Sequence, residues 1–274
     1  MSLVLVSLAV SYWGAGLLLY PPFMSAMTVF PEKFGAAYEK VSFCAADGHA
    51  LSGWFLKSPT GGAATVVLCH GWGDNKGELL EQTLFLNRDA GFNLFYFDFR
   101  GHGESQASQV TMGKMELLDL DAALAWAKAR SAGKLGLFGM SMGAAIAAMA
   151  LAKHHDISAA VLESPFAGFQ QVGRRWAWQY YRVPYFPLVW LQMRLARLRS
   201  GHDDIDSYSP ASYVGAATTT ALFIAAGTDT LMPPEDVRRL HDLAGGPKEF
   251  WVVPGAPHGK SRPAATREYD ARVT

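Results

Sequence analysis

The 274-residue sequence predicts an α/β fold, in which helices cover both faces of a mostly parallel sheet of eight strands. Three observations lead to this prediction. Short, nearly continuous apolar runs are typical of strands buried on both faces. Segments with helical spacing of apolar residues separate most of these runs. The chain is also long enough to form one large domain with a substantial core.

The expected strands begin with a hairpin around Asp47-Gly48, a dipeptide typical of tight turns between strands. The two hairpin strands lie within residues 40–56. The remaining six are expected over 65–71, 92–99, 134–139, 158–164, 220–227 and 248–255.

The expected helices occupy the intervals between these later strands. Gly91 ends the first helix, and prolines near the start and a glycine at the end delimit the fourth. The predicted helices cover 77–91, 115–130, the alanine-rich segment after Ser141, 233–245 and 261–272.

The first 31 residues carry no charged side chain, and an 18-residue apolar run from Leu3 to Tyr20 precedes two prolines. As a helix this run would be about 27 Å long, close to the thickness of a bilayer core. We therefore expect residues 1–31 to form a single-pass N-terminal membrane anchor, followed by a globular domain over 32–274. A buried helix is the alternative. Lys33 and Lys40 follow the run and nothing basic precedes it, which favours a cytoplasmic domain.

The segment Gly-Met-Ser-Met-Gly, residues 139–143, lies between an expected strand and an expected helix. Ser141 could simply cap the helix. The alternative is a nucleophile elbow, G-x-S-x-G, in which a serine sits on a turn so tight that only glycine fits two residues before and after it.

Polar motifs follow the other expected strands. In open α/β sheets, functional residues gather beyond the carboxyl ends of the strands. Asp229 follows a late strand, and His258 is the histidine that follows the last one. The order Ser141, Asp229, His258 is the order of an α/β-hydrolase triad.

Five motifs carry a resemblance to a known family: HGWGD (70–74), DFRGHGES (98–105), GMSMG (139–143), GTDTLMP (227–233) and PHG (257–259). From the hairpin to the C-terminus, the sequence resembles the α/β-hydrolase superfamily. Within it, the chain is similar to membrane-anchored hydrolases near the serine aminopeptidase and monoacylglycerol lipase branch. The resemblance implies the α/β-hydrolase fold.

Each expected site residue has a chemical role. Ser141 would attack an acyl carbon, His258 would accept and return its proton, and Asp229 would orient the imidazole. The backbone N–H groups of Trp72 and Met142 would stabilise the oxyanion. Glu163, at the end of the preceding strand, is the alternative to Asp229 as the acid of the triad.

We therefore expect a serine hydrolase that cleaves a carboxylic ester or thioester of a lipophilic acyl group. A peptidase is the nearest alternative, with Glu163 and the acidic stretch 202–206 holding a substrate amino terminus. A hydrolase-like binding protein without turnover is a further one. No metal or nucleotide motif is present, so no cofactor is expected. Asp98 and Arg100 are expected to form an internal ion pair.

An insertion over residues 166–213 interrupts the alternation and is too long for a connecting loop. Between Ser164 and His202 it contains six arginines and nine aromatic residues but no acid. We expect a helical cap or lid over the sheet, whose basic face also lies against an anionic membrane surface. The balanced charge, 24 basic against 24 acidic residues, and the absence of a binding motif argue against nucleic acid.

Overall fold

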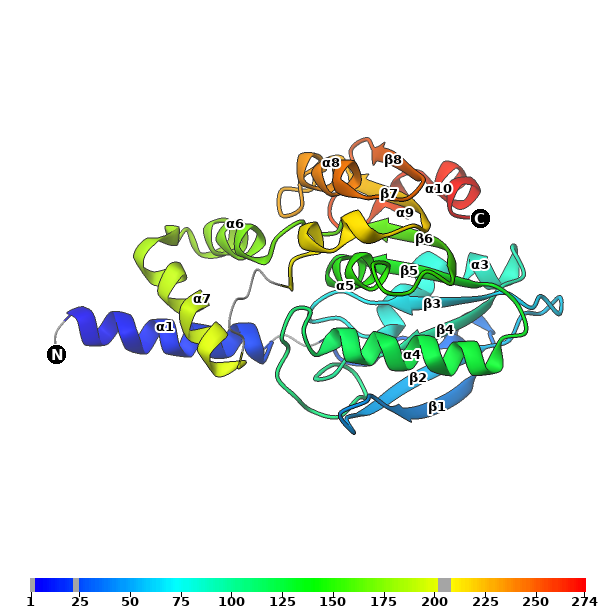
Figure 1. Ribbon diagram of the computed structural model, residues 1–274, viewed down its shortest axis with the longest axis horizontal. Coiled ribbons are helices and arrows are strands. Elements are labelled where there is room, and N and C mark those ends of the chain that lie inside the picture. The colour runs from blue at the N-terminus through cyan, green and yellow to red at the C-terminus, as the bar shows by residue number, and fades with distance from the viewer. Residues whose placement is uncertain (1–2, 22–24, 202–207) are drawn as a thin grey trace.

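The computed structural model describes residues 3–21, 25–201 and 208–274 (Figure 1). Within them, eight strands form one sheet. These are β1 (Glu39–Cys44), β2 (Ala50–Leu56), β3 (Thr65–Cys69), β4 (Asn93–Phe97), β5 (Leu135–Met140), β6 (Ile157–Glu163), β7 (Thr220–Ala226) and β8 (Lys248–Val253).

The order across the sheet is β1-β2-β4-β3-β5-β6-β7-β8. β1 pairs with β2, and β2 with β4, in antiparallel orientation, while every other neighbouring pair is parallel. The predicted mostly parallel, eight-stranded sheet is therefore confirmed. The parallel arrangement places the ends of β3, β5, β6, β7 and β8 at one edge, where the predicted site residues follow them.

Helices connect the strands and extend to both ends of the chain. They are α1 (Leu3–Leu19), α2 (Leu80–Thr83), α3 (Phe85–Arg88), α4 (Glu116–Arg130), α5 (Met142–Ala150), α6 (Phe169–Tyr181), α7 (Trp190–Arg199), α8 (Pro234–Leu243), α9 (Ser261–Ala264) and α10 (Thr266–Val273). Two predicted helices are shorter than expected. The 77–91 segment divides into a 3-10 turn, α2 and α3, and non-helical Ala265 separates α9 from α10.

Both faces of the sheet are buried, which explains the continuous apolar runs in the sequence. Val67 and Cys69 of β3 belong to the core that contains the inner faces of α4, α5 and α8. Leu68, between them, points into the opposite core, which contains α2, α3 and α10. A strand buried on both sides has no position where a polar residue is favoured.

The predicted membrane anchor is wrong. α1 is 17 residues long and ends at Leu19, before Tyr20 and Pro21. Nowhere in the described part of the chain is a helix both long and apolar enough to cross a membrane. The single-pass localisation has no support, and the argument from Lys33 and Lys40 for one side of a membrane has no basis.

α1 instead packs against the protein. Ser11, Ala15 and Leu19, spaced by four residues, are almost fully buried, and Ala15 and Leu19 form a small core with Ala196 of α7. Polar contacts fix the same face: Gln192 Nε2 donates to the Gly14 carbonyl at 2.9 Å, and Arg199 Nη1 donates to the Tyr12 carbonyl at 3.0 Å.

The insertion contributes α6 and α7. α7 packs against α1, and all three helices lie to one side of the sheet (Figure 1). One arginine of the insertion has an acidic partner in the main body, since Arg175 forms an ion pair with Asp236 of α8. The acidic stretch 202–206, which the peptidase interpretation used, lies outside the described residues.

Candidate active site

Ser141 occupies the single residue between β5 and α5, with φ of 55° and ψ of −118°. A positive φ is unfavourable for a residue with a side chain, so the surrounding structure must impose it. The Ser141 N–H donates to the Glu163 carbonyl of β6 at 2.9 Å, and its own carbonyl accepts the first helical bond, from Ala145. The turn is therefore held from both sides.

The two glycines of the motif are required by close backbone contacts. A Cβ on Gly139 would lie 2.6 Å from the backbone of Ala144. A Cβ on Gly143 would lie 2.2 Å from the carbonyl oxygen of Cys69 on β3. Neither position tolerates a side chain, which is the steric rule on which the elbow prediction rested.

The structure brings Ser141, His258 and Asp229 together in one hydrogen-bond chain. His258 Nδ1 lies 2.6 Å from Asp229 Oδ2, and His258 Nε2 lies 3.1 Å from Ser141 Oγ. A carboxylate can only accept, so Nδ1 carries the proton and Nε2 is free to accept one from the serine hydroxyl. Asp229 is held in turn by the backbone N–H groups of Leu231 and Met232, each 2.9 Å from Oδ1.

The electrostatics of the site favour a basic imidazole. Burial lowers the pKa of His258, but the hydrogen bond and charge of Asp229 outweigh it. Glu163 and Asp74 add smaller effects in the same direction, and the net pKa lies above its ordinary value. The imidazolium formed on accepting a proton is thereby stabilised.

Glu163, the alternative acid, has other hydrogen-bond partners. Its carboxylate is fully buried and accepts from the Tyr269 hydroxyl at 2.6 Å and from the Ser261 N–H at 3.4 Å. Burial raises its pKa. His258 Nδ1 donates to Asp229 and not to Glu163, so the geometry favours Asp229 as the orienting acid.

The two expected oxyanion donors lie on the segments that flank the serine. Met142 is the first residue of α5, so its N–H has no acceptor within the helix. Trp72 lies in the loop after β3, where a Cβ on the preceding Gly71 would lie 3.5 Å from Ser141 Cβ. Neither N–H donates to a backbone acceptor elsewhere in the described chain.

Two histidines brace the loop that carries Trp72. His70 Nε2 accepts from the Phe99 N–H at 3.1 Å, and His102 Nε2 accepts from the Gly73 N–H at 3.2 Å. The expected Asp98–Arg100 ion pair is wrong. Asp98 pairs instead with the fully buried Lys76, and Arg100 pairs with Asp119 and Asp47.

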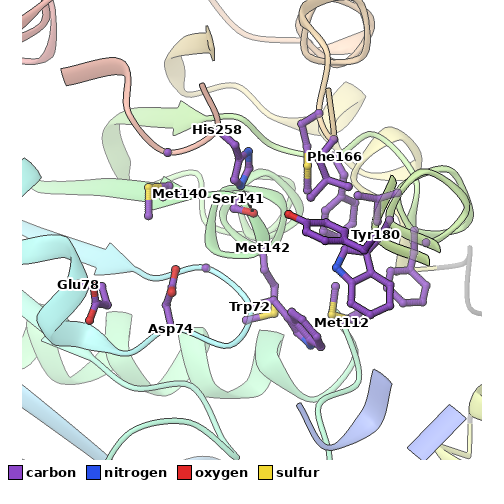
Figure 2. A pocket seen from close by; sticks show the side chains of 18 of the residues that line it. Trp72, Asp74, Glu78, Met112, Met140, Ser141, Met142, Phe166, Tyr180 and His258 are labelled. Atoms are coloured by element: carbon purple, nitrogen blue, oxygen red, sulfur yellow. Dashed lines mark hydrogen bonds between the residues drawn. The ribbon is translucent and has the colours of Figure 1, made fainter. Parts of the chain in front are cut away.

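A cavity of about 410 Å³ opens over the serine and extends to both sides of it (Figure 2). We call one side the aromatic arm; the side chains that define it are Leu18, Trp72, Met112, Phe166, Phe169, Val172, Trp176 and Tyr180. We call the other the acidic arm; it is defined by Asp74, Glu78, Gln82, Gly259 and Lys260. In Figure 2, Asp74 and Glu78 lie on one side of Ser141, and Trp72, Met112 and Tyr180 on the other.

Sequence reasoning missed the acidic arm. Asp74 ends the HGWGD motif, but no rule of spacing assigns its side chain to the cavity. Glu78 and Gln82 belong to a segment expected to be one continuous helix, in which their position relative to the serine could not be inferred. The four-residue spacing of Glu78 and Gln82, which places both on one face of the expected helix, is the signal that was available.

The fold and the site together define an α/β hydrolase. Residues 62–213 match the family model described as serine aminopeptidase, S33. Because this match spans more than half of the chain, the protein belongs to that family of hydrolases.

The chain is also similar to uncharacterized proteins and to a solved esterase structure. An uncharacterized protein of Mycobacterium tuberculosis strain CDC 1551 is 30% identical over 241 residues, covering 86% of this chain and 76% of the relative. An uncharacterized membrane protein of Saccharomyces cerevisiae is 25% identical over 251 residues, 88% of this chain and 81% of that one. The Pyrococcus furiosus esterase Pf2001 superposes with a TM-score of 0.78 at 27% identity, covering 93% of this chain and 96% of that chain.

Proposed function

We propose that the protein is a serine esterase that cleaves carboxylic esters or thioesters of lipophilic acyl groups. The observation that carries this proposal is the hydrogen-bond chain from Asp229 through His258 to Ser141, which lies at the wall of the cavity. A serine hydroxyl that lines a cavity and has a base within reach is what acyl transfer to water requires.

In the proposed reaction, Ser141 Oγ attacks the acyl carbon while His258 Nε2 takes the hydroxyl proton. The N–H groups of Trp72 and Met142 stabilise the negative oxygen of the tetrahedral intermediate. The carbon–oxygen or carbon–sulfur bond breaks, and His258 returns its proton to the leaving group. Water then attacks the acyl-serine with His258 again as base, releasing the acid and restoring the enzyme.

The aromatic arm supports a lipophilic acyl group as the substrate. Its side chains are predominantly apolar, and they come from α1, α6 and the loops after β3, β4 and β6. Each methylene transferred from water into such an environment contributes about 0.8 kcal/mol. We therefore place the acyl chain in the aromatic arm and propose that the insertion acts as its lid.

A peptidase has less support than an esterase. Glu163, one of the two acidic groups that this interpretation needs, is fully buried and engaged with Tyr269 and Ser261. A binding protein without turnover has no observation in its favour, because every group of the proposed triad has its hydrogen-bond partner.

We also propose that the outer faces of α1, α6, α7 and the connection 182–189 between the last two, here the outer helical surface, contact an anionic lipid surface without crossing it. Large aromatic side chains are exposed on it: Tyr12, Trp13, Trp178, Tyr180, Tyr181, Phe186 and Trp190. Arg174, Arg182 and Arg194 are exposed among them. An apolar surface that carries basic groups is complementary to anionic headgroups. Such a contact would bring lipophilic substrates to the aromatic arm, which α1 and α6 help to form.

Ser141→Ala should abolish labelling by a fluorophosphonate probe and lower turnover of p-nitrophenyl butyrate by about 10⁴-fold or more, because Ser141 supplies the hydroxyl that lies beside His258 Nε2. Mass spectrometry of the labelled wild-type peptide should locate the adduct on Ser141. An adduct that persists in the variant would contradict the proposed nucleophile.

Asp229→Asn should lower kcat for the same ester by roughly 10³–10⁴-fold, because an amide presents the wrong group to His258 Nδ1. Glu163→Gln is the matched control, since it makes the same chemical change at a carboxylate without a hydrogen bond to His258. Circular dichroism should verify that both variants fold. If Glu163→Gln has the larger effect, the acid lies on the preceding strand.

The activity should fall with decreasing pH through the pKa of His258, because the protonated imidazole cannot accept the serine proton. Asp229 raises that pKa, so the midpoint of kcat/KM should lie above the ordinary histidine value of about 6.5. Asp74, whose pKa is raised to about 6, titrates nearby, so the profile is measured in wild type and in Asp74→Asn. A midpoint below pH 6 in both proteins would exclude this assignment.

Changing Arg174, Arg182 and Arg194 together to Gln should weaken binding of the full-length protein to phosphatidylserine-containing vesicles. Each basic group near such a surface contributes about 1 kcal/mol at low salt. Changing the exposed Arg88, Arg239 and Arg267 to Gln is the control, since it alters the net charge equally away from the outer helical surface. Co-sedimentation measures both. Equal loss in the two triple variants, or no binding by wild type, would refute the contact.

A further inference from the structure

The acidic arm of the cavity has a chemistry that the proposed ester hydrolysis does not by itself use. Asp74 and Glu78 place two carboxyl groups on the opposite side of Ser141 from the aromatic arm, with Glu78 farther from the serine than Asp74 (Figure 2). Asp74 is close to the reacting atoms, because its Oδ2 lies 2.8 Å, and Ser141 Cβ 3.5 Å, from the point that a Cβ on Gly71 would occupy.

In a third residue of this arm, Gln82, the side-chain oxygen accepts no hydrogen bond in the described structure. Gln82 is 7% exposed, and its Nε2 donates to the Gly259 carbonyl at 2.8 Å. That bond fixes the amide orientation, so Oε1 is the acceptor end. Gln82 lines the cavity, and its Oε1 is buried and receives no hydrogen bond from any residue in the described ranges. A buried acceptor without a donor costs free energy that a ligand with an N–H group would recover.

The net charge of the acidic arm determines which kind of N–H group on a ligand it favours. Asp74 has a pKa raised to about 6, because burial and the nearby Glu78 carboxylate oppose its ionisation. His258, Lys260 and Ser25 act in the opposite direction, and the group is mainly ionised at neutral pH. Lys260 is the one cation among the cavity-lining residues described, and it is exposed and forms no ion pair with either carboxylate within the described chain. Two carboxylates against one ammonium leave the arm with a net negative charge.

We propose that the acidic arm binds the leaving group of the substrate, and that this leaving group carries an ammonium ion with at least one N–H. The inference rests on the proposed ester hydrolysis, and it names the class of alcohol: an amino alcohol. When the acyl carbon–oxygen bond breaks, the departing oxygen takes the proton held on His258 Nε2. The ammonium group keeps its own proton and stays paired with Asp74 and Glu78.

The experiment compares three octanoate esters that differ in the alcohol. The 2-(dimethylammonio)ethyl ester carries one N–H and a positive charge, and its tertiary nitrogen cannot accept the acyl group. The 2-(trimethylammonio)ethyl ester keeps the charge but has no N–H. The 3-methylbutyl ester is the neutral isostere of the first. For each enzyme the readout is the ratio of kcat/KM between esters, so that a general loss of activity cancels.

Wild type should prefer the dimethylammonio ester over the 3-methylbutyl ester by about tenfold or more, with the trimethylammonio ester between them. Asp74→Asn and Glu78→Gln should each lower the preference for charge by about threefold to tenfold, and Gln82→Leu should remove the advantage of the N–H ester over the quaternary one. Glu81→Gln is the matched control, because Glu81 is exposed on α2 and does not line the cavity.

The outcomes separate this inference from the proposed function. If wild type hydrolyses all three esters without preference, or if Asp74→Asn and Glu78→Gln keep the full preference, the ammonium site is wrong and the esterase stands. If wild type hydrolyses none of these esters nor p-nitrophenyl butyrate, the proposed function fails and this inference fails with it. Glu78 has no side-chain partner in the described residues, so Glu78→Gln tests the charge even where Asp74→Asn does not fold.

Discussion

The positive φ at Ser141 is the constraint on which the rest of the site depends. It arises because β5, which lies between β3 and β6, ends at Met140 and α5 begins at Met142. Ser141 is therefore the single residue in which the chain changes direction. Gly143 rests on the Cys69 carbonyl, and the Ser141 N–H is bound by Glu163. The strain of the turn, of order 1–3 kcal/mol, is thus balanced by contacts to two neighbouring strands. The same contacts hold the hydroxyl above the sheet edge, where a base can reach it.

A second set of contacts holds the loop after β3 against this turn. Lys76 is fully buried, and its ammonium group lies between Asp98 and Glu104 and over the Trp54 ring. A buried ion pair is weak evidence for net stability, because desolvation offsets its attraction. The ion pair instead helps to hold the loop in place. The backbone N–H of Lys76 also donates to Asp98 Oδ1 at 2.7 Å, which fixes the loop between Gly71 and Lys76. The proposed oxyanion donor and the acidic arm both depend on that loop.

The sequence predicts the sheet and the grouping of Ser141, His258 and Asp229, because each of these depends on local rules. Apolar runs mark doubly buried strands, and the ends of parallel strands must meet at one edge. Partners chosen by tertiary packing could not be predicted in this way. Asp98 and Arg100 are two residues apart after the same strand, yet their side chains have different partners. Asp98 pairs with Lys76, and Arg100 pairs with Asp119. The packing of α1 could not be predicted for a similar reason. Hydropathy reports that its residues are apolar, but not that Ser11, Ala15 and Leu19 are buried against other parts of the protein.

The position of Asp74 poses an electrostatic problem that bears on the choice of substrate. A carboxylate beside the serine stabilises the imidazolium on His258, and that effect lowers the barrier. In the proposed mechanism the same charge also repels the oxyanion, which raises the barrier. With a neutral alcohol the two effects oppose each other, and the carboxylate contributes little. An ammonium group on the departing alcohol changes this balance, because it neutralises Asp74 on the side facing the oxyanion. The acidic arm is therefore better explained by a cationic leaving group than by catalysis on neutral esters alone.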